Sequence, residues 1–108
     1  MAITMNLRYT GTDGAAVAFA REMQESGTVA KIQAEEGNLR YEYYVALDDP
    51  ETVLLIDSWA DQSALDVHHA SPMMATIASL RDKYNLHMTA ERYVSEDMPT
   101  SDSGFIRS

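Results

Sequence analysis

The chain carries residues that can remove a proton from a phenol or an enol and stabilise the anion that forms. His68 lies in a predicted helix, and because an imidazole titrates near neutral pH, a neutral His68 can act as a general base. Asn6 lies in a predicted strand, where asparagine is disfavoured, and its amide can donate a hydrogen bond to an oxyanion. Trp59 can stack on an aromatic ring. We therefore predict His68 and Asn6 as catalytic residues, and Trp59, Tyr44 and His69 as contacts to a small aromatic substrate.

Each main candidate also has a purely structural interpretation. His68, at the start of a helix, can bond a nearby carboxylate such as Asp57 or Asp61. Trp59 can close one end of the core, because large aromatic side chains are usually buried. Asn6 can bond neighbouring side chains of the sheet. The residue types alone leave both interpretations open.

Composition excludes several other chemistries. The chain has no cysteine, which excludes disulfides, thiolate zinc sites and cysteine nucleophiles. Adjacent histidines on a helix point about 100° apart, so His68 and His69 are a poor pair for one metal ion, and we expect no metal site. There is no glycine-rich phosphate loop, and we expect no nucleotide, flavin or other cofactor.

The charge balance bears on the partners. The 108 residues include 17 acidic and 8 basic side chains, for a net charge of -9. Such a surface repels phosphate, so we expect neither a nucleic acid nor an anionic membrane as partner. No stretch approaches the roughly 20 apolar residues that cross a bilayer. The N-terminus lacks the pattern of a signal peptide, and we expect a cytoplasmic protein.

The elements that must position these residues follow from the hydrophobic periodicity. Alternation of apolar and polar residues predicts four strands, over residues 2–10, 38–48, 52–60 and 85–95. Helical spacing predicts a helix from Ala15 that Gly27 interrupts and Gly37 ends, a short helix capped by Asp61, and a third that Ser71 caps with Pro72 as its first residue. This order is typical of a ferredoxin-like α+β fold, a four-stranded antiparallel sheet with helices on one face.

The strand at residues 52–60 predicts that two copies associate. Its centre, Val53-Leu54-Leu55-Ile56, is apolar on both faces, whereas the helices cover only one face of the sheet. An exposed apolar patch marks an interface, so we expect a homodimer through the sheet faces and a small apolar pocket under the helices of each subunit. We expect one domain over residues 1–96 and a flexible tail over 97–108, in which Phe105 and Ile106 can dock on a neighbour.

Two segments resemble the antibiotic biosynthesis monooxygenase family. Residues 36–44, E-G-N-L-R-Y-E-Y-Y, resemble its E-x-G-x-x-x-Y stretch, with the glycine one step closer to the glutamate. Residues 57–72 are similar to its E-x-W-x-x-x-x-A-L-x-x-H-x-x-S-P-H stretch, and the block from Trp59 to His68 is the specific part. The resemblance covers residues 2–95. It implies a dimeric α+β barrel and a cofactor-independent monooxygenase that oxidises a small quinol or an aromatic polyketide-like phenol with O2.

The chain departs from the family pattern at several positions. Asp57 stands where many members have glutamate, and His69 occupies a position that is usually apolar. Met73 stands where a second histidine often follows Ser-Pro, which argues against a mechanism with two histidines on this helix. Haem-degrading relatives carry their haem-ligating histidine where this chain has Ala78, so we expect no haem.

Two other functions stay open. A non-catalytic small-molecule-binding or stress-response module on the same barrel is favoured by the missing histidine at Met73. A small isomerase or decarboxylase is also compatible, because a base and an oxyanion donor serve enolisation without oxygen. Oxygen dependence separates the monooxygenase from the isomerase, and binding without turnover would indicate the module.

Overall fold

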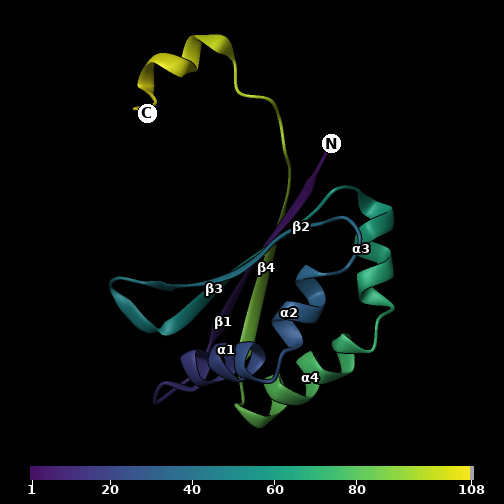
Figure 1. The fold of residues 1–108 in the computed structure, drawn as a ribbon. Coiled ribbons are helices and arrows are strands. Elements are labelled where there is room, and N and C mark those ends of the chain that lie inside the picture. The colour runs from purple at the N-terminus through teal and green to yellow at the C-terminus, as the bar shows by residue number, and fades with distance from the viewer. Residues whose placement is uncertain (108) are drawn as a thin grey trace.

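The elements follow one another in the predicted order, with helices between the first and second strands and between the third and fourth (Figure 1). The computed structural model describes residues 1–107. They form β1 (Ile3–Thr10), α1 (Ala15–Glu25), α2 (Thr28–Gln33), β2 (Asn38–Ala46), β3 (Asp49–Trp59), α3 (Gln62–His69), α4 (Met73–Lys83), β4 (His87–Val94) and a 3-10 helix, η1 (Thr100–Phe105). The sheet order is β2-β3-β1-β4 and each neighbouring pair is antiparallel. The predicted ferredoxin-like α+β fold is confirmed.

Turn and capping residues separate the helices, although α2 ends at Gln33 rather than at the predicted Gly37. Gly27 has a positive φ of 82° and separates α1 from α2. Gly37 also has a positive φ, and a Cβ there would lie 2.5 Å from the Cβ of Ala64, so the turn before β2 requires glycine. The Asp61 carboxylate accepts a hydrogen bond from the Ala64 amide at 2.8 Å and caps α3. These residues bring the end of α2 close to the start of α3.

Two predicted boundaries are wrong. Ser71 does not cap α4, because its hydroxyl makes no hydrogen bond within residues 1–107 and the residue before the helix is Pro72. β3 begins at Asp49 rather than at residue 52, because Ala46 already pairs with Asp49. The connection is therefore shorter than the predicted turn over residues 48–51, and the β2–β3 hairpin is longer.

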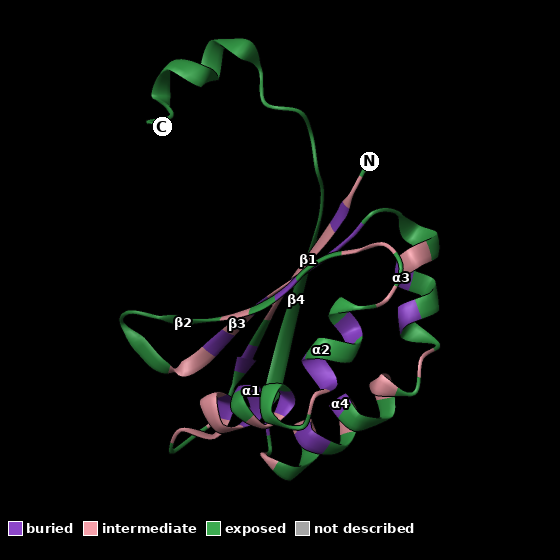
Figure 2. Ribbon diagram, viewed as in Figure 1, coloured by how far each residue is buried: buried purple, intermediate pink, exposed green. Residues whose placement is uncertain are grey.

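The core lies between the helices and one face of the sheet, which we call the inner face (Figure 2). The largest fully buried side chains come from both layers: Trp59, Phe19, Met23, Ile32, Leu55, Leu65 and Val53. On the opposite or outer face, Leu54 and Ile56 are half-buried and Tyr44 is 41% exposed. The outer face thus keeps apolar surface that no helix of its own subunit covers.

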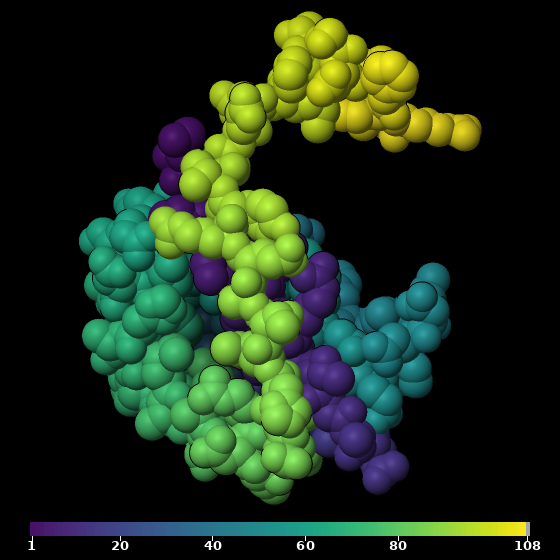
Figure 3. Space-filling view, turned by 180° about the vertical axis from the view of Figure 1, so that it is seen from behind, coloured from purple at the N-terminus to yellow at the C-terminus, as the bar shows by residue number. Residues whose placement is uncertain are grey.

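β4 is exposed along its whole length on both faces (Figure 2). A hollow therefore separates this edge of the sheet from α3 and α4, and Figure 3 shows it between the green helices and the lime strand. The tail continues from β4 away from the body, and η1 gives part of it regular structure. Of the predicted tail, Ser108 lies outside the described residues, and the flexibility of the rest stays a prediction. No helix among the described residues is long and apolar enough to span a membrane.

Candidate active site

His68 lies on the side of α3 that packs on the sheet, and only 2% of it is exposed. Its Nδ1 is 3.1 Å from Oε2 of Glu35, a residue that follows α2. The imidazole also stacks on the Trp59 indole, with ring centroids 4.7 Å apart and an angle of 26° between the planes. His68 and Trp59 are therefore neighbours in the structure. The carboxylate partner of His68 is Glu35, rather than the Asp57 or Asp61 that the sequence suggested.

Asp57 contacts the indole nitrogen of Trp59. The Trp59 Nε1 donates to Asp57 Oδ1 at 2.6 Å, and both residues are buried at the end of β3. Burial raises the pKa of Asp57, while the indole hydrogen bond and the nearby His68 and His69 oppose that rise. The site thus contains a fixed aromatic wall between a buried carboxyl group and a buried imidazole.

Three tyrosines extend this cluster along the inner face. Burial raises the pKa of Tyr9 to about 12 and raises the pKa of Tyr41 well above its usual value. Burial also raises the pKa of Tyr43, whose hydroxyl is buried with no hydrogen-bond partner within residues 1–107. At neutral pH these phenols therefore stay protonated and do not act as bases.

Asn6 and Tyr44 are not part of this cluster. Met5 pairs with Asp57 on the inner face, so Asn6, the next residue of β1, points to the outer face opposite Ile56. The structure does not bring Asn6 to His68 within one subunit. One subunit therefore cannot use both side chains on a single substrate.

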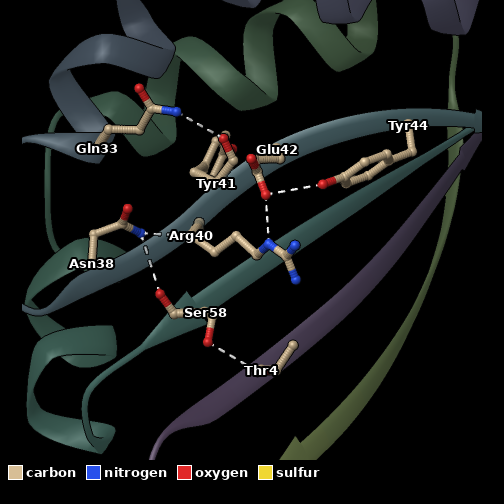
Figure 4. A network of polar contacts seen from close by, with 8 residues as sticks. All are labelled: Thr4, Gln33, Asn38, Arg40, Tyr41, Glu42, Tyr44 and Ser58. Carbon is tan, nitrogen blue, oxygen red and sulfur yellow. Dashed lines mark hydrogen bonds and ion pairs between the residues drawn. The ribbon is translucent and has the colours of Figure 1, made fainter. Parts of the chain in front are cut away.

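Tyr44 belongs to a polar network on the outer face (Figure 4). Its hydroxyl donates to Glu42 Oε1 at 3.0 Å, and Arg40 Nε donates to the same oxygen at 2.5 Å. The hydrogen bonds from Arg40 and Tyr44 lower the pKa of Glu42. This network is on the far side of the sheet from Trp59.

His69 is exposed at the end of α3, and the same helix carries Gln62, a residue that the sequence analysis missed. Gln62 and His69 lie seven positions apart on α3 and so share one face of the helix. The Gln62 Oε1 accepts a hydrogen bond from Arg92 Nη2 of β4 at 2.6 Å. The pair Gln62 and Arg92 thus bridges the hollow. Arg92 interrupts the apolar series of Met88, Ala90 and Val94, and this break was the signal for it.

The predicted pocket under the helices is not open to His68 in this conformation. Four cavities of about 230 to 660 Å³ lie on the described surface, and neither His68 nor Trp59 lines any of them. Met5 of β1 and Met88 of β4 lie on the inner face of the sheet. Within residues 1–107, no three histidine, aspartate or glutamate side chains gather in a metal-binding arrangement.

Comparisons with known proteins were made by sequence and by structure. The family model described as antibiotic biosynthesis monooxygenase matches residues 2–79. A comparison with curated proteins found no match.

Solved structures share the fold at low sequence identity. SnoaB, a cofactor-independent oxygenase from Streptomyces nogalater, is 17% identical, with a TM-score of 0.75 over 92% of this chain and 97% of its own. PA3566 from Pseudomonas aeruginosa is 22% identical, with a TM-score of 0.74 over 89% of this chain and 95% of its own. A conserved protein from Methanosarcina mazei is 21% identical, with a TM-score of 0.76 over 89% and 94%.

Proposed function

Because the chain belongs to the antibiotic biosynthesis monooxygenase family, we propose that it is a cofactor-independent monooxygenase that oxidises a small quinol or an aromatic polyketide-like phenol with O2. The observation that carries the proposal is the arrangement of His68, which is held by Glu35 and stacked on Trp59. The solved structure of SnoaB, a cofactor-independent oxygenase with the same fold, supports this class of reaction.

In this proposal His68 is the general base. When its Nδ1–H donates to the Glu35 carboxylate, the lone pair on Nε2 is left to accept the phenolic proton. The Glu35 charge then stabilises the imidazolium, as a buried carboxylate does for other histidine bases. Trp59, fixed by its bond to Asp57, provides a flat wall for the substrate ring.

The substrate itself supplies the electrons. The phenolate passes electrons to O2, and a ring carbon then forms a bond to one oxygen atom. Loss of water from the resulting hydroperoxide leaves a carbonyl group on that carbon. One oxygen atom ends in the product and the other in water, with the two hydrogens that the substrate gives up, so the four electrons that reduce O2 all come from the ring.

Because only 2% of His68 is exposed, we propose that α3 moves away from the sheet to admit the substrate. The hydrogen bond from Arg92 to Gln62 joins α3 to β4 across the hollow. We propose that this bond opens when substrate enters, with His69 at the rim as a second contact. Lid movements of this kind exclude water once the substrate is bound.

We further propose that two copies pack through their outer faces. The exposed Tyr44 and Tyr93 and the half-buried Leu54 and Ile56 give this face the apolar surface of an interface. In such a dimer Asn6 would lie between the sheets. Its role would then be in assembly, in place of the catalytic role that the sequence suggested.

Oxygen uptake with hydroquinones and anthrones tests the activity, and ¹⁸O2 shows whether one labelled atom enters the product. We expect His68→Ala to lower kcat at least a hundredfold, in line with the loss of a general base. His87→Ala is the matched control, because His87 is an exposed histidine on β4, and it should keep full activity. Equal uptake by both variants would remove His68 from the mechanism.

The burial of His68 favours one second candidate, a non-catalytic small-molecule-binding or stress-response module. A sealed imidazole can hold the structure of a binding protein without reacting. This candidate predicts that a phenolic ligand raises the melting temperature while oxygen uptake stays at the background rate. The same samples therefore separate the two functions.

A further inference from the structure

The C-terminal tail leaves its own subunit after Ser95. The Ser95 amide donates to the Ala2 carbonyl at 2.9 Å, and the Ala2 amide donates back to the Ser95 hydroxyl at 3.1 Å. Every residue from 96 to 107 is exposed, and the hydrogen bonds recorded there join tail residues to one another. The tail therefore has regular structure in η1 without a surface of its own subunit beneath it.

This tail holds three large apolar side chains in solvent. Phe105 is 90% exposed, Met98 60% and Ile106 55%. The radius of gyration is 15.3 Å, whereas a compact chain of this length would have about 13 Å. Exposed apolar groups on an arm that extends from the body indicate a binding segment.

The end of the β2–β3 hairpin offers a matching surface. Leu47 at its tip is fully exposed, and Tyr44 on the outer face is 41% exposed. A cavity of about 230 Å³ opens beside them on the outer face, lined by Arg8, Tyr44, Val45, Ala46, Thr52 and Leu54. Figures 1 and 3 show the tail and the hairpin projecting to the same side of the molecule.

The topology places these two arms at opposite corners of the sheet. β4 and β2 are the two edge strands, and the antiparallel pairings put the C-terminal end of β4 at the end away from the hairpin tip. If the two-fold axis of the dimer lies in the interface and is perpendicular to this diagonal, the tail corner of one copy lies over the hairpin corner of the other. The same contact then forms twice in the dimer, once for each tail.

We propose that residues 96–107 of one copy dock on the β2–β3 hairpin of a second copy, with Phe105 and Ile106 in the cavity between Tyr44 and Leu54. The inference rests on the outer-face dimer proposed above. With η1 retained, at about 2.0 Å per residue, and the other residues extended, the tail spans about 32 Å, and a strand of eight residues such as β1 is about 27 Å long. The tail is therefore long enough to reach a partner packed on the outer face.

Cysteine crosslinking tests the contact directly, since the natural chain has no cysteine. A chain with Ile106→Cys is mixed with a chain with Ala46→Cys, allowed to exchange subunits and oxidised. We expect a disulfide-linked heterodimer on a non-reducing gel. Ile106→Cys mixed with Glu25→Cys, an exposed position on α1, is the control and should give at most a trace. A double variant, Ala46→Cys/Ile106→Cys, that closes a loop within one chain would overturn the proposal.

Sedimentation separates this inference from the dimer on which it rests. Phe105→Asp/Ile106→Asp should raise the dimer dissociation constant at least tenfold, and truncation after Ser95 should do the same. Thr100→Asp/Ser101→Asp adds equal charge at exposed polar positions and should change it less than threefold. Dimers with an unchanged dissociation constant would overturn the tail contact alone. A wild-type chain that stays monomeric would overturn both proposals and leave the oxygen-uptake result standing.

Discussion

The two faces of the sheet consist of the same strands, yet ionisable side chains are buried on the inner face and exposed on the outer face. On the inner face the buried Asp57 accepts from an indole, and the buried His68 meets a single glutamate. On the outer face two networks of the same type, arginine, glutamate and tyrosine, lie in water. They are Arg40 with Glu42 and Tyr44, and Arg8 with Glu91 and Tyr93.

The difference shows which face suits chemistry and which suits assembly. Burial raises the pKa of Asp57, whereas hydrogen bonds from Arg40 and Arg8 lower the pKa of Glu42 and Glu91. The pKa of a buried ionisable group is shifted from its value in water, and acid–base catalysis uses such shifts. Exposed ion pairs add little to the stability of one subunit, but charges that are complementary across an interface fix the position of the partner. We therefore expect inner-face variants to affect stability and turnover, and outer-face variants to affect association.

The sharpest test of this contrast is Trp59→Ala, which we expect to lower the free energy of unfolding by about 3–5 kcal/mol. The loss combines a cavity in the core with an unpaired Asp57. Trp59→Phe keeps a ring beside His68 but loses the indole N–H, and should lower it by about 2 kcal/mol. Urea titrations followed by circular dichroism measure both.

Tyr44→Phe is the outer-face control for this series. It removes a hydroxyl that donates to the exposed Glu42, so the free energy of unfolding should change by less than about 0.5 kcal/mol. If Trp59→Ala and Tyr44→Phe had similar effects, the two faces would not differ as described.

The second test uses the pH dependence of Asp57. Because folding raises its pKa, the folded protein holds this proton more tightly than the unfolded chain. The contribution of this proton to the free energy of unfolding is present at pH values below the pKa of Asp57 in the unfolded chain. It is lost as the pH rises through the pKa of Asp57 in the folded protein. Asp57→Asn keeps an oxygen that accepts from Trp59 but cannot ionise. Its stability relative to wild type should therefore rise between pH 4 and pH 8, as urea titrations at each pH would show.

Asp48→Asn, at an exposed hairpin position, controls for the general effect of removing a carboxylate. Its stability relative to wild type should show a smaller change over the same pH range. A flat or falling difference for Asp57→Asn would mean that the buried carboxyl group is not destabilised by ionisation.

Local sequence signals predicted the fold well. Alternation placed the strands, Gly27 and Asp61 marked helix boundaries, and the Trp59–His68 block identified two side chains that stack. Each of these features depends on residues close together in the chain. Glu35 was missed as the partner of His68 because the two lie 33 positions apart and meet only when α2 and α3 pack together.

The separation of Asn6 from His68 was, in contrast, already implicit in the alternation. Asn6 shares its face with Thr4 and Arg8, whereas the apolar neighbours Met5 and Leu7 must face the helices. A residue on the polar side of β1 cannot reach the core under α3. Residue type suggested chemistry for Asn6, but the period of two decided its position.

The smallest effect on the single subunit is expected for the outer-face glutamates. Glu42→Gln and Glu91→Gln remove charges that lie on the exposed surface, so the urea midpoint should not move measurably. If the outer faces pair, the same substitutions leave Arg40 and Arg8 facing the partner without their counter-charges. The dimer dissociation constant from sedimentation should then rise about tenfold. If these variants lowered the free energy of unfolding as much as Trp59→Phe does, the outer-face glutamates would instead contribute to folding.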